Sequence, residues 1–163
     1  MAAKKKFPYK SAVVACNGGC QRSAGEAGCK DGCTGCKSCV SKCRVGAICI
    51  NERGVALVDE EKCIGCGACV KACPQQIIHI HECANWIVVK CSNKMKGQEA
   101  KKQCKVSCIG CGICEKTCTA GAIKVIDKCA VIEEAICLSC GMCAVKCPRH
   151  AIYDLRGILT AKM

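Results

Sequence analysis

The sequence predicts an α+β fold of two duplicated units, in which short strands and one-turn helices surround cysteine-rich loops. Three observations lead to this prediction. The chain of 163 residues contains 24 cysteines. It contains only one Phe, two Tyr and one Trp, and because aromatic side chains dominate the burial energy of most cores, it needs another source of stability. Finally, the second half of the chain repeats the cysteine spacing of the first.

The repeat becomes visible when the chain is aligned with itself at an offset of 75 residues. Cys33-Thr34-Gly35-Cys36 then matches Cys108-Ile109-Gly110-Cys111, and after a one-residue deletion Leu57–Glu60 matches Val131–Glu134. Agreement over most of the chain indicates an internal duplication. We therefore predict four segments: a basic N-terminal lead at 1–10, a first unit at 11–85, a second unit at 86–157 and a tail at 158–163.

Short apolar runs predict the strands. A hairpin is indicated where Asn51–Gly54 separates two such runs. The predicted strands are Ala47–Ile50, Val55–Val58, Ile77–His81, Trp86–Val89, Ala122–Ile126 and Ala130–Ile132, and Gly97–Gln103 is predicted to be a short helix. Because His79 and His81 alternate with isoleucines, we expect both on the exposed face of their strand. Elements this short cannot bury enough apolar surface alone, so the cysteine sites are predicted to form the cores.

Four times the chain reads C-x2-C-x2-C-x3-C, at Cys33/Cys36/Cys39/Cys43, Cys63/Cys66/Cys69/Cys73, Cys108/Cys111/Cys114/Cys118 and Cys137/Cys140/Cys143/Cys147. This is the run of bacterial ferredoxins, in which three closely spaced thiolates hold three irons of a [4Fe-4S] cube. Two residues between ligands make a tight loop, and glycines in that loop let the backbone wrap the cube closely. Each half is therefore predicted to be a bacterial-type 2[4Fe-4S] ferredoxin-like unit.

In two-cluster ferredoxins the fourth cysteine of each run binds the other cluster. Proline usually follows that cysteine, as Pro74 and Pro148 do here, whereas Arg44 and Thr119 replace it in the other two runs. The predicted ligand sets are Cys33, Cys36, Cys39 and Cys73 for cluster 1; Cys63, Cys66, Cys69 and Cys43 for cluster 2; Cys108, Cys111, Cys114 and Cys147 for cluster 3; and Cys137, Cys140, Cys143 and Cys118 for cluster 4.

Other roles for so many cysteines fit less well. Zinc ribbons use two separated C-x2-C pairs rather than three cysteines in seven residues followed by a fourth, and a metallothionein-like store would not show organised strand signals. Disulfides are disfavoured because we see neither a signal-peptide core nor a stretch long enough to span a bilayer, so we expect a reducing cytoplasmic setting and no direct membrane insertion.

Eight cysteines lie outside the four runs. Two further clusters can be drawn from them, one with Cys16, Cys20, Cys29 and Cys49 and one with Cys83, Cys91, Cys104 and Cys129. No compact spacing supports that grouping, so we favour buried thiols that pack beside the clusters, or redox-active thiols. In a third alternative, Cys29 replaces Cys36 as a ligand. We therefore expect four clusters, with room for up to six.

The formal net charge of +12 resembles a nucleic-acid signal but counts every thiol as neutral. A [4Fe-4S] core held by four thiolates carries a charge of about −2, so four clusters would lower the sum from +12 to about +4. We therefore do not expect a nucleic-acid partner. Lysines crowd one insertion, which is either a solvated face or a dock for an acidic ferredoxin or flavoprotein: Lys94, Lys96, Lys101, Lys102 and Lys105.

Three stretches resemble the B subunit of the Rnf ion-translocating ferredoxin:NAD oxidoreductase complex: Val14–Cys20, Val88–Gly97 and Cys104–Cys118. The spacing of Cys29, Cys33, Cys39 and Cys43 also matches that family's first ferredoxin run. The resemblance implies a protein that takes electrons from reduced ferredoxin and feeds them to membrane partners. Family members begin with a hydrophobic anchor and a further four-cysteine domain, which we do not find here, so a soluble Rnf-B-like polyferredoxin is expected.

The sequence thus predicts an electron-transfer polyferredoxin, the iron–sulfur wire subunit of a larger anaerobic oxidoreductase. We expect redox proteins as partners, namely ferredoxin, flavoprotein or membrane oxidoreductase subunits within a hetero-complex. The expected location is the cytoplasm, with the cytoplasmic face of a membrane complex as the more specific option. We find no nucleophile–base pair or nucleotide fingerprint, and so expect no independent active site. The alternative function is a redox-sensing or metal-handling protein that works through the spare thiols.

Overall fold

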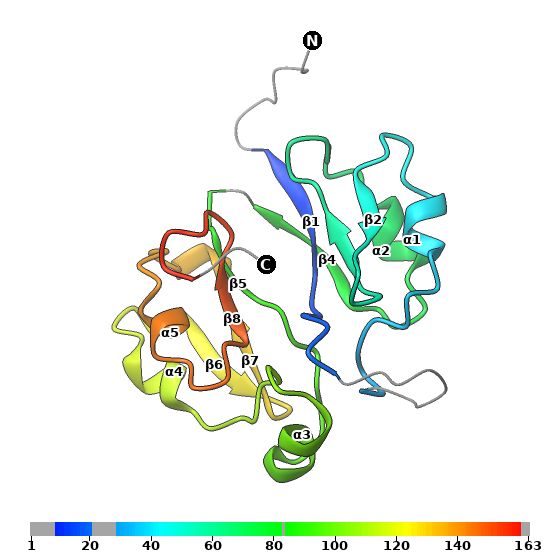
Figure 1. Ribbon diagram of the computed structural model, residues 1–163. Coiled ribbons are helices and arrows are strands. Elements are labelled where there is room, and N and C mark those ends of the chain that lie inside the picture. Colours follow the sequence, from blue (N-terminus) through cyan, green and yellow to red (C-terminus); the bar gives the residue numbers. More distant parts are fainter. Residues whose placement is uncertain (1–8, 21–28, 83, 161–163) are drawn as a thin grey trace.

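The structure is a computed structural model that describes residues 9–20, 29–82 and 84–160. Its described part alternates short strands and short helices (Figure 1), which confirms the predicted α+β class. Within these residues each strand pairs antiparallel with one partner, and the strands form four two-stranded sheets. None of the helices in the described residues is long and apolar enough to cross a membrane.

The first half of the chain is built from an outer strand pair and an inner hairpin. The outer pair joins β1 (Lys10–Val14) to β4 (Ile78–Glu82), with Lys10 opposite Glu82. The hairpin joins β2 (Ile48–Ile50) to β3 (Ala56–Val58). Two short helices follow the cysteine loops and pack against each other: α1 (Ser38–Ser41) and α2 (Ala68–Ala72).

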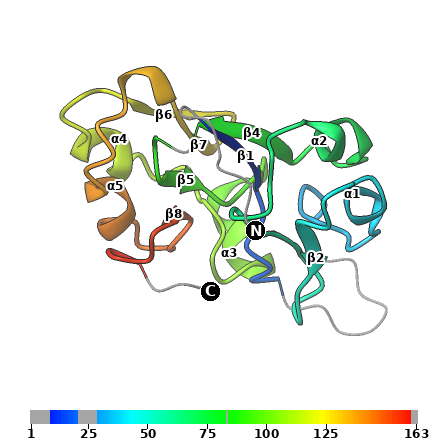
Figure 2. The same cartoon turned by 90° about the horizontal axis from the view of Figure 1, so that it is seen from above.

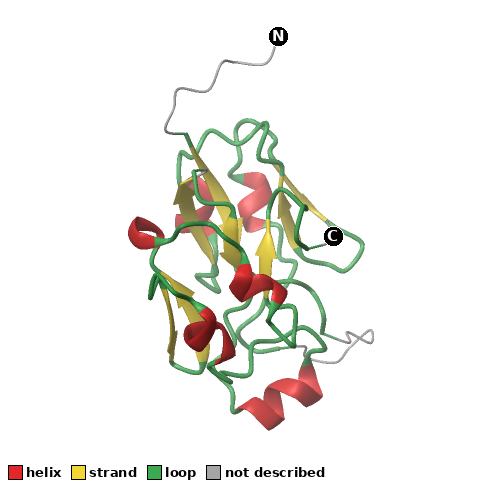
Figure 3. Ribbon diagram, turned by 90° about the vertical axis from the view of Figure 1, so that its left-hand side faces the viewer, coloured by secondary structure: helices red, strands yellow, loops and turns green. Residues whose placement is uncertain are grey.

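The second half repeats this plan. β5 (Ile87–Val89) pairs with β8 (Ile152–Asp154), and β6 (Ile123–Ile126) forms a hairpin with β7 (Cys129–Ile132). The helices that follow its cysteine loops are α4 (Ile113–Thr117) and α5 (Met142–Val145). Two elements lack a counterpart in the described residues of the first half, the helix α3 (Gly97–Gln103) and the 3-10 turn η1 (Glu134–Ile136). Figure 3 shows α3 at the lower end of the molecule.

The two halves lie side by side with their outer strand pairs facing each other. Viewed from above, α1 and α2 lie on one side of the molecule and α4 and α5 on the other, with β1, β4 and β5 between them (Figure 2). Each half has its own core, which includes buried cysteines. A third small cluster lies between the halves, where Val13 of β1 packs with Val88 of β5 and Tyr153 of β8. Apolar packing therefore joins the halves through the outer strands.

The hairpin strands and α3 were predicted well, and α3 has the bounds that the sequence indicated. The runs Ile77–His81 and Trp86–Val89 are strands shifted by about one residue, β4 and β5. These two neighbours do not pair with each other; each pairs with a strand from the opposite end of its own half. The closing strands β1 and β8 are thus the elements that complete each half.

Backbone conformation repeats with the cysteines. In each of the four runs, the residues two, four and thirteen positions after the first cysteine have positive φ. The twelve residues are Gly35, Lys37 and Gly46; Gly65, Gly67 and Gln76; Gly110, Gly112 and Gly121; and Ser139, Gly141 and His150. The position four after the first cysteine is also the N-cap of the helix that follows. Left-handed turns at fixed places therefore bend all four loops in the same way.

Gly65 and Gly67 offer a matched test of this loop geometry. Both have positive φ, at 67° and 74°, so alanine at either position costs about 1–2 kcal/mol in backbone strain. A Cβ at Gly67 meets nothing within 4 Å, whereas one at Gly65 would lie 2.6 Å from the carbonyl oxygen of Lys10. We expect Gly65→Ala to lower the denaturation midpoint clearly more than Gly67→Ala, because β1 must also shift. Equal losses in anaerobic urea titrations would contradict this.

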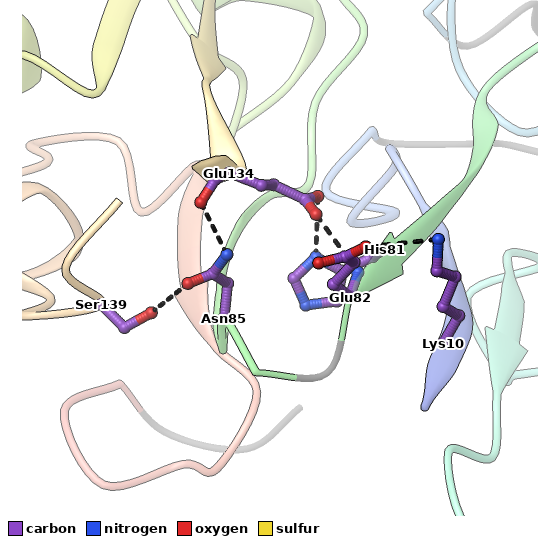
Figure 4. A network of polar contacts seen from close by, with 6 residues as sticks. All are labelled: Lys10, His81, Glu82, Asn85, Glu134 and Ser139. Carbon is purple, nitrogen blue, oxygen red and sulfur yellow. Dashed lines mark hydrogen bonds and ion pairs between the residues drawn. The ribbon is translucent and has the colours of Figure 1, made fainter. Parts of the chain in front are cut away.

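A polar network fastens the two halves together (Figure 4). Glu134 of η1 accepts a hydrogen bond from the backbone N–H of Glu82, at 3.2 Å, and its Oε1 lies 2.9 Å from His81 Nδ1. Asn85 donates to the carbonyl oxygen of Glu134, at 2.8 Å. His81 is fully buried, so the prediction that both histidines of β4 lie exposed is wrong for His81. The carboxylate from the other half provides a polar partner that permits this burial.

Replacing Glu134 with alanine should weaken the contact between the halves. The change leaves the buried His81 ring and the Glu82 amide without an acceptor, which costs about 1–3 kcal/mol in the free energy of unfolding. Glu133→Ala is the control, since it removes a carboxylate at the neighbouring position for which the described residues show no ion pair. The measurement is the urea midpoint of the anaerobic holoprotein, and equal midpoints for the two variants would refute the role of Glu134.

Candidate metal centres

Three cavities in the structure are each lined by four cysteines of the repeated runs. One is lined by Cys33, Cys36, Cys39 and Cys73, among apolar neighbours that include Ile77 and Ile78. The other two lie in the second half, and their cysteines are Cys108, Cys111, Cys114 and Cys147 in one and Cys118, Cys137, Cys140 and Cys143 in the other. In each cavity the fourth cysteine comes from the partner run of the same half, so the chain brings together the crossed sets 1, 3 and 4.

The cysteines of the second set also lie in one neighbourhood. Cys69 faces Cys63 and Cys66 closely enough for their charges to interact. Cys43 packs against the core cluster that contains Cys63 and Cys69. Across the described residues, no three His, Cys, Asp or Glu side chains converge on a point that one metal ion could occupy. A cube of four irons instead needs its thiolates spread around it.

The exposure of the second and third cysteines is the same in every run. The second cysteine is exposed in all four runs, at Cys36, Cys66, Cys111 and Cys140, and the third is buried in all four. Burial raises the pKa of the third thiol, to about 11 for Cys114 and to about 12 for Cys143, and also raises that of Cys39 and Cys69. A metal that binds these thiols therefore has to displace their protons.

Backbone amides point at several of the sulfurs. Ala47 N donates to Cys43 Sγ at 3.2 Å, and Ala151 N, which also lies four residues after the last cysteine of its run, donates to Cys147 Sγ at 3.4 Å. Ala12 N of β1 donates to Cys63 Sγ at 3.4 Å. Such N–H···S bonds stabilise negative charge on the sulfur and so favour the reduced form of a cluster. The donor set, the glycine turns and the amide bonds together fit [4Fe-4S] clusters.

The structure groups the cysteines outside the four runs differently from the two groups of four considered from the sequence. Contact with the Cys20 thiol raises the pKa of both Cys29 and Cys104. Cys29 therefore lies against Cys20, while Cys36 lines the first cavity. Cys129 donates from Sγ to the carbonyl oxygen of Cys91, at 3.2 Å, and contact with its thiol lowers the pKa of Cys91 to about 7. Cys49 lies exposed on β2, and Cys83 is outside the described residues.

Family models place iron–sulfur binding domains along the chain. One model, described as a 4Fe-4S binding domain, matches residues 56–79. A second model of the same description matches residues 28–46, 107–121 and 134–154. Each matched segment contains one complete cysteine run. These matches confirm the prediction of tandem ferredoxin domains that bind [4Fe-4S] clusters.

Similar proteins with curated names belong to redox complexes. The chain is 40% identical over 152 residues to the B subunit of a proton-translocating ferredoxin:NAD(+) oxidoreductase complex from Clostridium ljungdahlii, covering 92% of this chain and 53% of that protein. It is 38% identical over 130 residues to the B subunit of the Na(+)-translocating complex from Acetobacterium woodii, covering 80% of this chain and 39% of that protein.

A third relative is archaeal, the B subunit of an ion-translocating oxidoreductase complex from Methanosarcina acetivorans. It is 34% identical over 125 residues, which are 77% of this chain and 47% of that protein. The chain thus spans about half the length of these relatives or less. The similarity covers most of this chain and supports the resemblance inferred from the sequence.

Proposed function

Because the chain is a polyferredoxin that resembles the ferredoxin-like part of the B subunit of the Rnf ion-translocating ferredoxin:NAD oxidoreductase complex, we propose that it relays single electrons through four [4Fe-4S] clusters. Its relatives are named as parts of oxidoreductase complexes. We propose that this chain is likewise the non-catalytic iron–sulfur wire of a larger complex. The clusters supply the redox chemistry, and the protein positions them and tunes their potentials.

The proposed ligands are the four crossed sets. Cluster 1 takes Cys33, Cys36, Cys39 and Cys73, and cluster 2 takes Cys63, Cys66, Cys69 and Cys43. Cluster 3 takes Cys108, Cys111, Cys114 and Cys147, and cluster 4 takes Cys137, Cys140, Cys143 and Cys118. We further propose that residues 11–85 and 86–157 are the two 2[4Fe-4S] units. The separate cores of the halves support this division.

The observation that carries the proposal is the crossing of runs at the cavities. Each of the three cavities takes its fourth cysteine from the other run of its half. The side chain of Cys143 in the fourth set also interacts with Cys114 of the third. Two clusters held in this way lie close together within each half, which is the arrangement that passes an electron from one cluster to the next.

Metal analysis of the anaerobically purified chain tests the function. We expect at least about 16 iron and 16 sulfide per chain, with EPR signals of reduced, spin-coupled [4Fe-4S] clusters after addition of a low-potential donor. A reduced ferredoxin should pass electrons to the chain, and a soluble acceptor should withdraw them again. About four zinc per chain and no visible iron–sulfur absorption would overturn the proposal.

We propose a docking face for an acidic redox partner around α3. Lys94, Lys96, Lys101, Lys102 and Lys105 carry its positive charge, and Lys101 and Lys102 of the helix itself are exposed, while Ala100 on the other face of the helix is buried. Such a cluster attracts an acidic ferredoxin or flavoprotein and speeds its arrival. We propose the cytoplasm as the location of the chain, with the cytoplasmic face of a membrane complex as the more specific option.

Charge reversal tests the docking face. The double variant Lys101→Glu, Lys102→Glu should slow the second-order rate of electron transfer from an acidic ferredoxin about tenfold or more at low salt, and the difference should shrink at high salt. The control is Lys42→Glu with Lys71→Glu, which changes the net charge equally at exposed lysines of the first half. Stopped-flow traces that show the same slowing for both pairs would argue against a specific dock.

A further inference from the structure

Four cysteines outside the ferredoxin runs gather where the two halves meet. Cys20 forms an isolated antiparallel bridge with Cys104, and Lys105 N donates to Gly19 O at 3.2 Å. The first segment follows β1 and the second follows α3, so residues from both halves meet here. The side chains meet as well, because the Cys20 thiol contacts the thiols of both Cys29 and Cys104.

Cys16 completes the group. A Cβ placed on Gly32 would lie 3.4 Å from Cys16 Sγ and 3.5 Å from Cys29 Cβ, so the glycine occupies the space between these two cysteines. Gly19 plays a similar part, because a Cβ there would lie 3.2 Å from Cys104 Sγ and would overlap the Val106 side chain. Two glycines without side chains thus leave room around four half-buried thiols.

Hydrogen bonds from both halves hold this place together. Lys94 N donates to Asp31 Oδ2 at 2.9 Å, and the Ser92 hydroxyl donates to Asp31 O. Arg149 Nη2 donates to Cys104 O at 2.6 Å. The loop that follows Cys29 is therefore tied to the loop before α3, and the C-terminus of α3 is tied to the last cysteine loop. These hydrogen bonds fix the contact between the two halves at this place.

We propose that Cys16, Cys20, Cys29 and Cys104 bind a fifth iron–sulfur centre, a [4Fe-4S] cluster that joins the two halves of the chain. Four thiolates are the complete ligand set of such a cluster. In the described part of the chain these thiols do not converge on a point for one ion, and Cys20 contacts two of them. A disulfide would use only two of the four sulfurs.

The fifth cluster lies where it can carry electrons between the two halves. This role rests on the proposed electron-transfer function. Cys16 interacts with Cys33 of the first ligand set. On the other side, Cys104 interacts with Cys91, and Cys91 Sγ accepts a hydrogen bond from Cys108 N of the third set, at 3.2 Å. The fifth centre therefore lies between clusters 1 and 3, where it connects two cluster pairs that would otherwise be separate.

Iron counting on single variants of the full chain tests the inference. We expect about 20 iron per wild-type chain, and about 16 in Cys20→Ala and in Cys104→Ala. The control Cys49→Ala removes an exposed cysteine of β2 and should keep about 20. Loss of iron should also slow electron exchange between the halves, seen as slower complete reduction by a donor that docks on one half.

Several results would overturn the inference. They are an iron content that is the same in Cys104→Ala as in wild type, loss of one zinc ion instead of iron, loss of one iron without the EPR signal of a three-iron cluster, and a disulfide between two of the four cysteines. A total of about 16 iron that Cys104→Ala leaves unchanged removes the fifth centre and keeps the four-cluster function. Absence of iron–sulfur absorption in the wild type would remove both.

A measurement on the wild-type chain covers the case in which the variants do not fold. Iodoacetamide should modify Cys49 in the anaerobic holoprotein and leave Cys16, Cys20, Cys29 and Cys104 unmodified until the metal is removed. Peptide mass spectrometry reads the modification site by site. Labelling of Cys20 or Cys104 in the holoprotein, at a rate similar to that of Cys49, would contradict the inference.

Discussion

Removal of iron is expected to unfold the chain, with loss of its strand signal and of its dispersed NMR spectrum. The strands of the described residues contain only three to five residues each, and two-stranded sheets of that size are marginal in water. The buried cores consist mainly of Ala, Val, Ile and Cys. Each cluster cross-links two cysteine loops, and these cross-links are lost when the metal is removed. Binding of the clusters therefore supplies the free energy that folds the chain.

The experiment compares holoprotein with protein stripped by a strong chelator under mild acid and then returned to neutral pH in reductant. A sample taken through the same pH steps without chelator is the control. Circular dichroism and a proton–nitrogen correlation spectrum report the outcome. An apo chain that keeps a dispersed spectrum and a cooperative thermal transition would show that the apolar cores suffice. Refolding on addition of iron and sulfide should restore the native spectrum.

Cysteine spacing carried most of what the sequence could predict. A loop that holds a cube needs ligands and left-handed turns at fixed offsets, and both are local properties of a run. The same offsets recur in all four runs even where the residue is Lys37 or Ser139 instead of glycine. The hairpins and α3 were likewise predictable, because turn residues and breakers mark their ends within a few positions.

Long-range pairing could not be predicted in the same way. β1 pairs with β4 across about 70 residues of chain, and no local signal states the register. The burial of His81 depends on Glu134, which lies 53 residues further along the chain. The meeting of Cys20 with Cys104 depends on how the halves dock. The alternation of histidine and isoleucine along β4 therefore indicated that His81 is exposed, whereas the other half of the chain covers it.

Pairs of cysteine substitutions should reveal the crossing of ligands in the second half. If Cys111 and Cys147 bind the same cluster, the double variant Cys111→Ala, Cys147→Ala should lose about as much iron as either single variant, about four atoms. The double variant Cys111→Ala, Cys118→Ala removes the same number of thiols from two different clusters. We expect it to lose about eight iron atoms per chain.

The reciprocal pairs provide the matched control. Cys140→Ala with Cys118→Ala should behave as one lesion, and Cys140→Ala with Cys147→Ala as two. Cys111 and Cys140 are the exposed ligands of their runs, so replacing them disturbs the buried core least. Should a damaged cluster keep three irons, each lesion would cost one iron instead of four, and the contrast between one lesion and two would still appear in the EPR spectrum.

The opposite pattern would refute the crossing. Uncrossed ligation predicts that Cys111→Ala with Cys118→Ala counts as one lesion, because both residues belong to one run.

Crossing has a structural consequence as well, since it makes each cluster a link between two loops about 30 residues apart. A single lesion in the second half should therefore also loosen the loop of the undamaged cluster. Faster hydrogen exchange of the amide of Ala151, which donates to Cys147 Sγ, would show this in Cys111→Ala, a variant in which Cys147 itself is intact.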